Sequence, residues 1–321
     1  MSITKTEQFY DDECRYIQGI SNTKESVLAN FMKLLLFSRS YYGSHILEKY
    51  LSHEKYPSFS NKGKYNLIMY SVYCESINHA DEKIKNFECD CCKGVTELYK
   101  NAYNWLQDFE TKKNHLRHAN TNIIFKGDTM TSVFTPLKEY IKLRNDINET
   151  FSKTQWADYW IRNYSSLNIS ESACDFIWFG YSFANFIPVP QGFNRGRSNF
   201  GKWDSWDLTL TQIYQWYRDN SQTNNFSNDS ALENLFTQNK EEAIEHCKKW
   251  LKMFYSWGDF VKQNYMEAFL LPDGSPKKFF NNHTLEYGLP KTLDEYEEFF
   301  KNAVSCIKER GNTLNKVLNM E

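Results

Sequence analysis

The sequence predicts a mainly α, multi-helical globular protein with at most a small β element near the middle. Phe, Tyr and Trp make up 17% of the 321 residues, enough apolar side chain to build a sizeable core. Only 13 Gly and 7 Pro are present, which argues against a loop-rich all-β fold. Apolar residues recur at intervals of three and four along several long segments, which is the spacing of helices that bury one face.

The first part of the chain is expected to hold three long helices. We place them at residues 23–50, 64–86 and 90–108. Residues 121–125 are expected to form a short strand within the polar stretch 111–131. A soft boundary in this stretch divides the chain into an N-terminal helical region, residues 1–125, and a C-terminal helical region, residues 126–321, unless both form one continuous domain.

Proline positions organise the middle of the chain. Pro136 fits the first turn of a helix running to about Phe151, because that turn does not need its missing N–H. A short helix is expected at 156–164. The dense apolar run that starts at Cys174 ends in Pro188 and Pro190, which favour extended backbone.

Two further helices and a capping motif complete the expected fold. A loop over residues 191–202 leads to a helix over 206–217, and a long helix is expected over 241–269 with a bend at Gly258. Residues 271–274 carry a turn signal. Thr292 and Glu295 form a capping box that opens a helix running to about Arg310. We expect the neighbouring carboxylates to complement the dipole of this helix.

Charge and hydropathy exclude several classes of protein. There are 38 basic and 40 acidic residues, so the chain is not a strongly basic histone-like protein, although a local basic patch stays open. No apolar run reaches the roughly 18 residues of a membrane helix, and no signal peptide is recognisable. We expect the 8 Cys to be free, buried thiols in the cytoplasm. The abundance of Asn, Lys, Tyr and Ile is typical of low-GC bacteria, where accessory proteins often serve phage defence.

The loop over residues 191–202 is the strongest candidate site. It concentrates three glycines with polar and basic residues, namely Asn194, Arg195, Arg197, Asn199 and Lys202. Arginine forks suit phosphate and carboxylate oxygens, and the helix start at Trp206 offers free backbone N–H groups. The sequence therefore predicts a site for an anionic ligand, a nucleic acid or a nucleotide. Asp207 would organise the loop or face a metal. The alternative is that Arg195 and Arg197 pair with Asp204 and Asp207 and only pin the loop.

Several blocks around this loop resemble an uncharacterised bacterial family, a domain of unknown function. Residues 187–198 read IPVPQGFNRGRS, and residues 204–210 read DSWDLTL. The later blocks FYSWGDF, at 254–260, and LPKT, at 289–292, agree in order. The likeness spans about residues 175–310, and Asn194, Arg197, Trp206 and Asp207 match its pattern by position. The family implies no established activity.

A fainter likeness is to His-Asn metal-finger nucleases. Residues 184–188, followed by Asn194, Phe200 and Lys202, are similar to the closing half of that motif. Such an enzyme needs a His as general base beside a phosphate bound by a divalent metal. No His lies between His118 and His246, so His115 or His118 would have to approach through the fold. A metal-dependent phosphodiesterase is therefore an alternative function.

One group of Cys and His residues has the composition of a zinc site. Its members are Cys89, Cys91, Cys92, His115 and His118. Cys89 and Cys92 have the separation of a zinc knuckle, and two His residues three apart can share a helix face. The alternative is free cysteines at a helix start beside a surface His pair.

Two aromatic blocks lie in the C-terminal region. They comprise Tyr214, Trp216 and Tyr217, and Trp250, Phe254, Tyr255 and Trp257. We expect most of these rings to build core, whereas exposed members next to Arg197 would be able to stack on bases. A third function follows from the same blocks: a non-enzymatic interaction module whose aromatic surface is covered by a protein partner or by a second copy.

Overall fold

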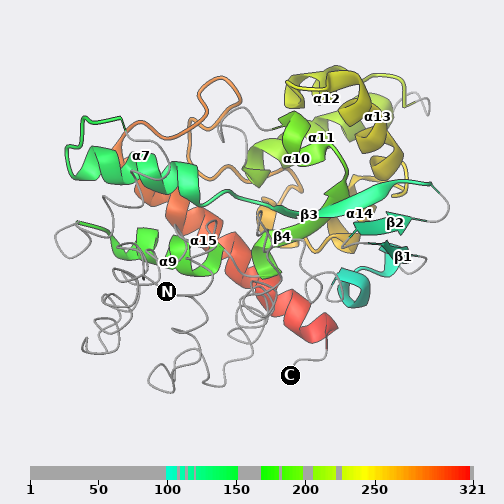
Figure 1. The fold of residues 1–321 in the computed structure, drawn as a ribbon, viewed down its shortest axis with the longest axis horizontal. Helices are drawn as coiled ribbons and strands as arrows, with labels where there is room; N and C mark the ends of the chain where they lie inside the picture. Colours follow the sequence, from blue (N-terminus) through cyan, green and yellow to red (C-terminus); the bar gives the residue numbers. More distant parts are fainter. Residues whose placement is uncertain are drawn as a thin grey trace, which may run out of the picture.

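The computed structural model describes residues 99–106, 109–112, 115–118, 121–150, 168–180, 183–197, 205–221 and 226–318. These residues form a mainly helical protein with one small antiparallel sheet, which confirms the predicted fold class (Figure 1). The helices are η3 (Asn104–Leu106), α7 (Phe134–Arg144), α9 (Glu171–Gly180), η4 (Phe183–Asn185), α10 (Phe193–Arg197), α11 (Trp206–Ser221), α12 (Ser230–Leu235), α13 (Lys240–Leu251), α14 (Trp257–Gln263), η5 (Glu267–Phe269) and α15 (Leu293–Val317). Within the described ranges, no helix combines the length and the apolar character that crossing a bilayer requires.

The sheet joins segments that are distant in the sequence. Its strands are β1 (Phe109–Lys112), β2 (His115–His118), β3 (Ile124–Thr129) and β4 (Phe186–Pro190), in the spatial order β1-β2-β3-β4. β3 pairs with β4 from Phe125↔Pro190 to Thr129↔Phe186. The extended run ending in Pro188 and Pro190 therefore forms an edge strand, where a missing N–H costs no ladder bond. The boundary placed near residue 125 falls inside this sheet.

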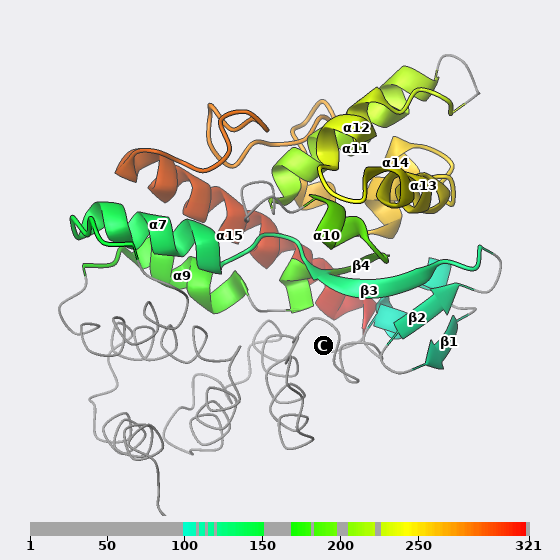
Figure 2. The ribbon, with the colours of Figure 1, turned by 45° about the horizontal axis from the view of Figure 1, so that its top comes forward.

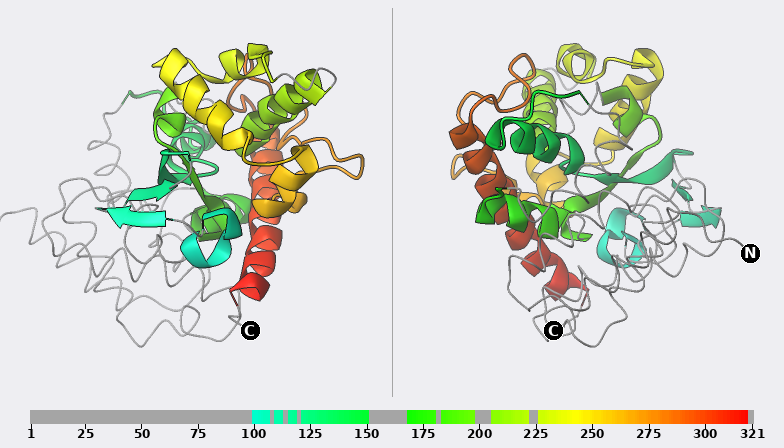
Figure 3. Two further views of the ribbon diagram at one scale, coloured as in Figure 1. Left: turned by 90° about the vertical axis from the view of Figure 1, so that its right-hand side faces the viewer. Right: turned by 60° about the vertical axis from the view of Figure 1, so that its left-hand side comes forward.

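Helices lie on both sides of the β3–β4 pair. α15 packs against α7, α9 and η4, and α10 contacts β4 and α13. Figure 2 shows α10 directly beside β4, and α13 also contacts this strand. Both views in Figure 3 show α15 as one long rod that passes beside α9. The site described below lies where α10 and α11 meet the sheet.

Aromatic side chains fill the core, as their number predicts. Trp206, Trp216 and Trp250 are completely buried. The ring of Phe193 contacts Trp206 of α11 and lies 5.5 Å from the ring of Trp250 of α13. Such edge-to-face pairs add to the free energy gained from burial. Most members of the two aromatic blocks are thus core residues, although Tyr255 is 94% exposed.

One buried cation ties α15 to the sheet. Arg310 donates from Nη1 to the carbonyl oxygens of Ala184 at 2.6 Å and Phe186 at 3.1 Å, and from Nη2 to the hydroxyl of Tyr103. Burial raises the pKa of Tyr103 to about 12, so this phenol stays neutral at physiological pH. The capping box of Thr292 and Glu295 is confirmed, but α15 continues past Arg310 to Val317.

Several element boundaries differ from the prediction. The expected helix over 241–269 is three elements, α13, α14 and η5, because Ser256 adopts extended backbone and accepts from the N–H of Asp259 to start α14. Gly258 lies inside α14 and is not the bend. The expected loop over 191–202 contains the short helix α10, and α7 ends at Arg144 instead of Phe151. The helices expected at 23–50, 64–86 and 156–164, and most of 90–108, lie outside the described residues.

Candidate functional site

The candidate site is the corner where β4 turns into α10. Gly192 sits in this turn with φ +91°, a left-handed conformation that favours glycine. Gly196 lies inside α10, where an added Cβ would be 2.8 Å from the Cβ of Ala243 and 3.0 Å from the carbonyl oxygen of Gln238. Its carbonyl oxygen accepts from the N–H of Thr237 at 2.8 Å. Gly192 therefore permits the turn and Gly196 permits close packing on α13.

Arg197 is the internal anchor of α10. Its Nη2 lies 2.6 Å from Oδ2 of Asp128 on β3, and both side chains are fully buried. Nη1 donates to the hydroxyl of Thr209 on α11 at 3.1 Å. The guanidinium also lies over the rings of Phe193 and Trp206, at 5.4 and 5.9 Å. These contacts link β3, α10 and α11, so Arg197 is an interior structural residue.

The two residues ahead of Gly196 are on the surface. Asn194 is half-buried and Arg195 is exposed. Within the described part of the chain, no carboxylate lies at ion-pair distance from Arg195. His246 of α13 lies against the preceding turn, with Nδ1 3.0 Å from the carbonyl oxygen of Gln191. The corner thus presents an amide and a cation outward while Arg197 holds it from the inside.

Trp206 and Asp207 begin α11 and are both buried. Oδ1 of Asp207 accepts from the hydroxyl of Ser205 at 2.7 Å, and Oδ2 accepts from the N–H of Phe279 at 2.8 Å. Nδ1 of His283 lies 2.5 Å from the same Oδ2. Both oxygens of Asp207 are engaged by the protein, which fits a loop organiser and not a metal-facing carboxylate.

For Arg195 and Asp207, the pairing expected as the alternative to ligand binding is not formed among the described residues. Arg197 pairs with Asp128, and Asp207 pairs with His283. Asp204, Asn199 and Lys202 lie outside the described residues. Sequence reasoning did not select Asp128 or His283. Asp128 lies just past the strand expected at residues 121–125, whereas nothing local distinguished His283.

The two histidines of the Cys and His group do not share a helix face. His115 and His118 lie on the strand β2, where positions three apart belong to opposite faces of the sheet, and not on a helix. Nδ1 of His118 is 3.0 Å from the hydroxyl of Thr121. Cys89 and Cys92 lie outside the described residues. Among the residues that are described, no group of three or more His, Cys, Asp or Glu side chains is placed to hold a metal ion.

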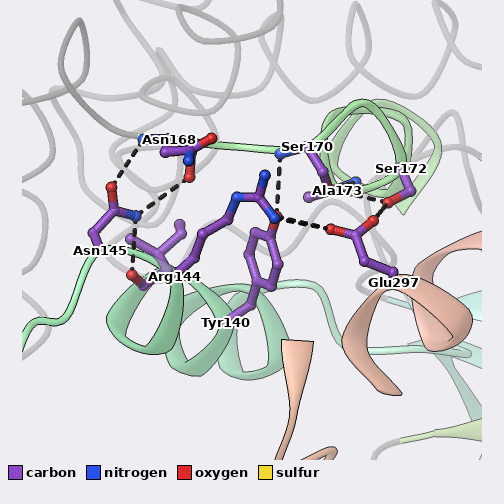
Figure 4. A network of polar contacts seen from close by, with 9 residues as sticks. Tyr140, Arg144, Asn145, Asn168, Ser170, Ser172, Ala173 and Glu297 are labelled. Atoms are coloured by element: carbon purple, nitrogen blue, oxygen red, sulfur yellow. Dashed lines mark hydrogen bonds and ion pairs between the residues drawn. The ribbon is translucent and has the colours of Figure 1, made fainter. Parts of the chain in front are cut away.

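A second polar cluster joins α7, α9 and α15 (Figure 4). The hydroxyl of Tyr140 donates to Oε1 of Glu297 at 3.0 Å and accepts from the N–H of Ser170 at 3.1 Å. Ser172 also donates to this carboxylate, and Nη1 of Arg144 is 3.5 Å away from it. Burial acts to raise the pKa of Glu297, but these hydrogen bonds and the nearby guanidinium outweigh it and lower the pKa. Glu297 therefore stays ionised and holds three helices together.

The described thiols are not nucleophiles. Cys247 and Cys306 are buried and free. Burial raises the pKa of Cys247 far above that of an ordinary thiol and raises the pKa of Cys306 to about 12. Because the thiolate is the reactive form, neither side chain is ready for covalent chemistry at neutral pH.

No protein-family model matches the chain, and neither the curated proteins nor the solved structures contain a match. The resemblance drawn from the WDLTL and LPKT blocks therefore stays a prediction. The site has to be interpreted from its own geometry.

Proposed function

We propose that the chain binds an anionic ligand, a nucleic acid or a nucleotide, at the corner between β4 and α10. Asn194 and Arg195 make the contacts, whereas Asn199 and Lys202, which lie outside the described residues, stay candidates from the sequence alone. The observation that carries the proposal is the opposite placement of two arginines in one five-residue helix, because Arg197 is buried and paired while Arg195 is exposed.

The contacts of buried Arg197 fix the position from which exposed Arg195 binds the ligand. The ion pair with Asp128 and the bond to Thr209 fix the orientation of α10 on the sheet. A ligand at Arg195 then orders a side chain but no backbone, which lowers the entropic cost of binding. The planar guanidinium and the neighbouring amide of Asn194 supply several N–H donors for phosphate oxygens.

Trp206 and Asp207 act indirectly in this proposal. Both are buried, so they fix the start of α11. The same burial gives no support for a metal held by Asp207. A metal-dependent phosphodiesterase would also need a His near Asn194, and the described His246 is held against the Gln191 carbonyl oxygen.

Fluorescence anisotropy on the full chain tests the proposal. The probes are labelled single-stranded oligonucleotides and a labelled nucleoside triphosphate, each titrated at several salt concentrations. Arg195→Ala is expected to weaken binding and, for an oligonucleotide, to lower the slope of log K against log salt by about one, because one phosphate contact is lost. Lys301→Ala, an exposed cation on α15, is the matched control and should bind like the wild type.

Two results would overturn the proposal. One is that the wild type binds none of these probes. The other is that Arg195→Ala binds every probe as the Lys301→Ala control does. In either case the corner between β4 and α10 would have a structural role only.

A further inference from the structure

One side of the sheet carries cations next to the corner between β4 and α10. Arg117 on β2 pairs in register with Ile124 on β3, and Lys126 follows two residues later on the same strand. Residues that lie opposite each other on paired strands, and residues two apart along one strand, share a side of the sheet. Arg117, Ile124 and Lys126 therefore lie on one side, which we call the cationic sheet face.

The other side of the same strands packs on the core. Leu116 and Phe125, which precede and follow residues of the cationic sheet face, are 2% and 0% exposed. Arg117 is exposed, whereas Ile124 and Lys126 are half-buried. This is the alternation of an antiparallel sheet that buries one side and leaves the other in contact with solvent.

The cationic sheet face is continuous with the corner. Asp128 follows Lys126 by two residues and so lies on the same side, where its carboxylate binds Arg197 of α10. The N–H of Gln191, in the turn before α10, donates to the carbonyl oxygen of Ile124 at 2.7 Å. α10 therefore covers this side of the sheet at one end, and the cationic sheet face continues from it towards β2.

Two of the described acidic residues share this side of the sheet. The Asp128 carboxylate is engaged by Arg197. Glu110 of β1 is the register partner of Arg117, and Lys112 two residues later falls on the same side, so the charges of these two β1 residues cancel. Each acidic residue is therefore matched by a cation that does not belong to the cationic sheet face.

The neighbouring helix α13 adds no net charge. It packs against α10 and β4, and its sequence contains three lysines and three glutamates. Within the described part of the chain, Arg117, Lys126 and Arg195 have no carboxylate at ion-pair distance. The cationic sheet face and the corner together thus carry an excess of positive charge.

We infer that the ligand is a nucleic acid, whose successive phosphates lie along Arg195, Lys126 and Arg117; this inference rests on the anion site proposed for the corner. Residues on paired strands that are offset by two positions lie about 7–8 Å apart, so Arg117 and Lys126 are separate points of positive charge. A nucleic acid carries one charge per nucleotide and can contact each point, whereas a mononucleotide carries its phosphates in one place. Ile124, next to both cations, offers an apolar contact to a base or sugar.

Fluorescence anisotropy on the full chain tests this by comparing a labelled nucleoside triphosphate with labelled oligo(dT), oligo(U) and a duplex, each of about 15 nucleotides. We expect tighter binding of at least one oligonucleotide than of the triphosphate, and the three oligonucleotides distinguish DNA, RNA and duplex as the source of the phosphates. Lys126→Ala and Arg117→Ala should each lower the salt slope of oligonucleotide binding by about one, because each removes one phosphate contact. Neither should change triphosphate binding, since both lie outside the corner.

Matched variants keep the test specific. Lys301→Ala removes an exposed cation on α15 and should leave all binding unchanged. Lys126→Gln keeps most of the side chain without its charge and should reproduce Lys126→Ala, whereas Lys126→Arg should keep the wild-type salt slope. Agreement of these variants excludes misfolding as the cause of weaker binding.

The variants also separate this inference from the proposed function. If Arg195→Ala weakens every probe but Lys126→Ala and Arg117→Ala weaken none, the inference is overturned while the corner stands as an anion site. If the two sheet variants weaken oligonucleotide binding and Arg195→Ala does not, the path through the corner is wrong and the proposed function fails with it.

Two further results would overturn the inference. One is that no oligonucleotide binds more tightly than the triphosphate. The other is that inorganic polyphosphate displaces the oligonucleotide as effectively as an unlabelled oligonucleotide with the same number of charges. The surface would then select repeated charge alone and not a nucleic acid.

Discussion

Arg197 of α10 and Asp128 of β3 form an ion pair inside the protein, with 2.6 Å between Nη2 and Oδ2 and with both side chains fully buried. The two residues are distant in the sequence, and the pair joins the short helix to the sheet. Burying a charge costs free energy unless the charge is paired. The ion pair therefore favours the position of α10 against the sheet, because moving the helix away would separate the two charges. The same docking fixes Arg195 on the surface.

Arg197→Ala should destabilise the protein by about 3–5 kcal/mol, because it leaves the buried Asp128 carboxylate without its guanidinium. Urea unfolding followed by far-UV circular dichroism measures this change. The control is Arg195→Ala, for which we expect a change within about 0.5 kcal/mol, since its side chain is exposed. Equal effects of the two variants would contradict the assignment of Arg197 as the anchor.

Replacing both partners separates the cost of an orphaned charge from the value of the pair. The double variant Arg197→Met with Asp128→Leu should be more stable than Arg197→Ala, because neither buried charge remains. If the double variant is the less stable of the two, the ion pair contributes more than the neutral packing that replaces it.

Glu297→Gln should destabilise the protein at pH 7 but not in acid. The pKa of Glu297 is lower in the folded protein than its ordinary value near 4.3. A lowered folded pKa contributes stability that is fully present above the unfolded pKa and is lost as the pH falls through the folded pKa. The difference between the wild type and the variant should therefore shrink from about pH 5 downward.

Unfolding free energies measured from pH 7 to pH 3 test this prediction. Glu298→Gln is the matched control, because it removes a neighbouring carboxylate of the same helix. A constant gap between Glu297→Gln and the wild type at every pH would show that the cluster in Figure 4 does not depend on the charge of Glu297.

Gly196→Ala should destabilise the protein by about 1–3 kcal/mol, because its new methyl group would lie 2.8 Å from the Cβ of Ala243. Gly258→Ala is the control. It lies in α14, where the nearest atom to an added Cβ is the hydroxyl of Ser256 at 3.9 Å, and alanine favours a helix. Thermal melting should show a lower Tm for the first variant and an equal or higher Tm for the second. A tolerated Gly196→Ala would mean that α10 can move away from α13.

Local chemistry made several elements predictable. The capping box of Thr292 and Glu295 and the proline in the first turn of α7 depend on neighbouring residues alone, and both are confirmed. The prediction of one helix over 241–269 was wrong. Apolar residues recur at helical spacing on both sides of Ser256, so the pattern did not indicate that Ser256 caps a new helix. The Ser256 to Asp259 spacing was the local signal for that break.

The partners inside the site were not predictable in the same way. Arg197 pairs with Asp128 on β3, and Asp207 pairs with His283 far along the chain. Spacing along the chain cannot choose among charged partners, since the choice depends on which strands pair and which helix covers them. The exposed state of Tyr255 among buried aromatic neighbours depends on the same packing.

The sequence by itself determined the helical class, the extended backbone at Pro188 and Pro190 and the capped start of α15, because each depends on periodicity or on the residues within a few positions. Only the tertiary structure decided which arginine of α10 is an anchor and which one faces the solvent. Two arginines two residues apart have the same chemistry, and the difference between them arises because the pairing of β3 with β4 brings Asp128 beneath one of them.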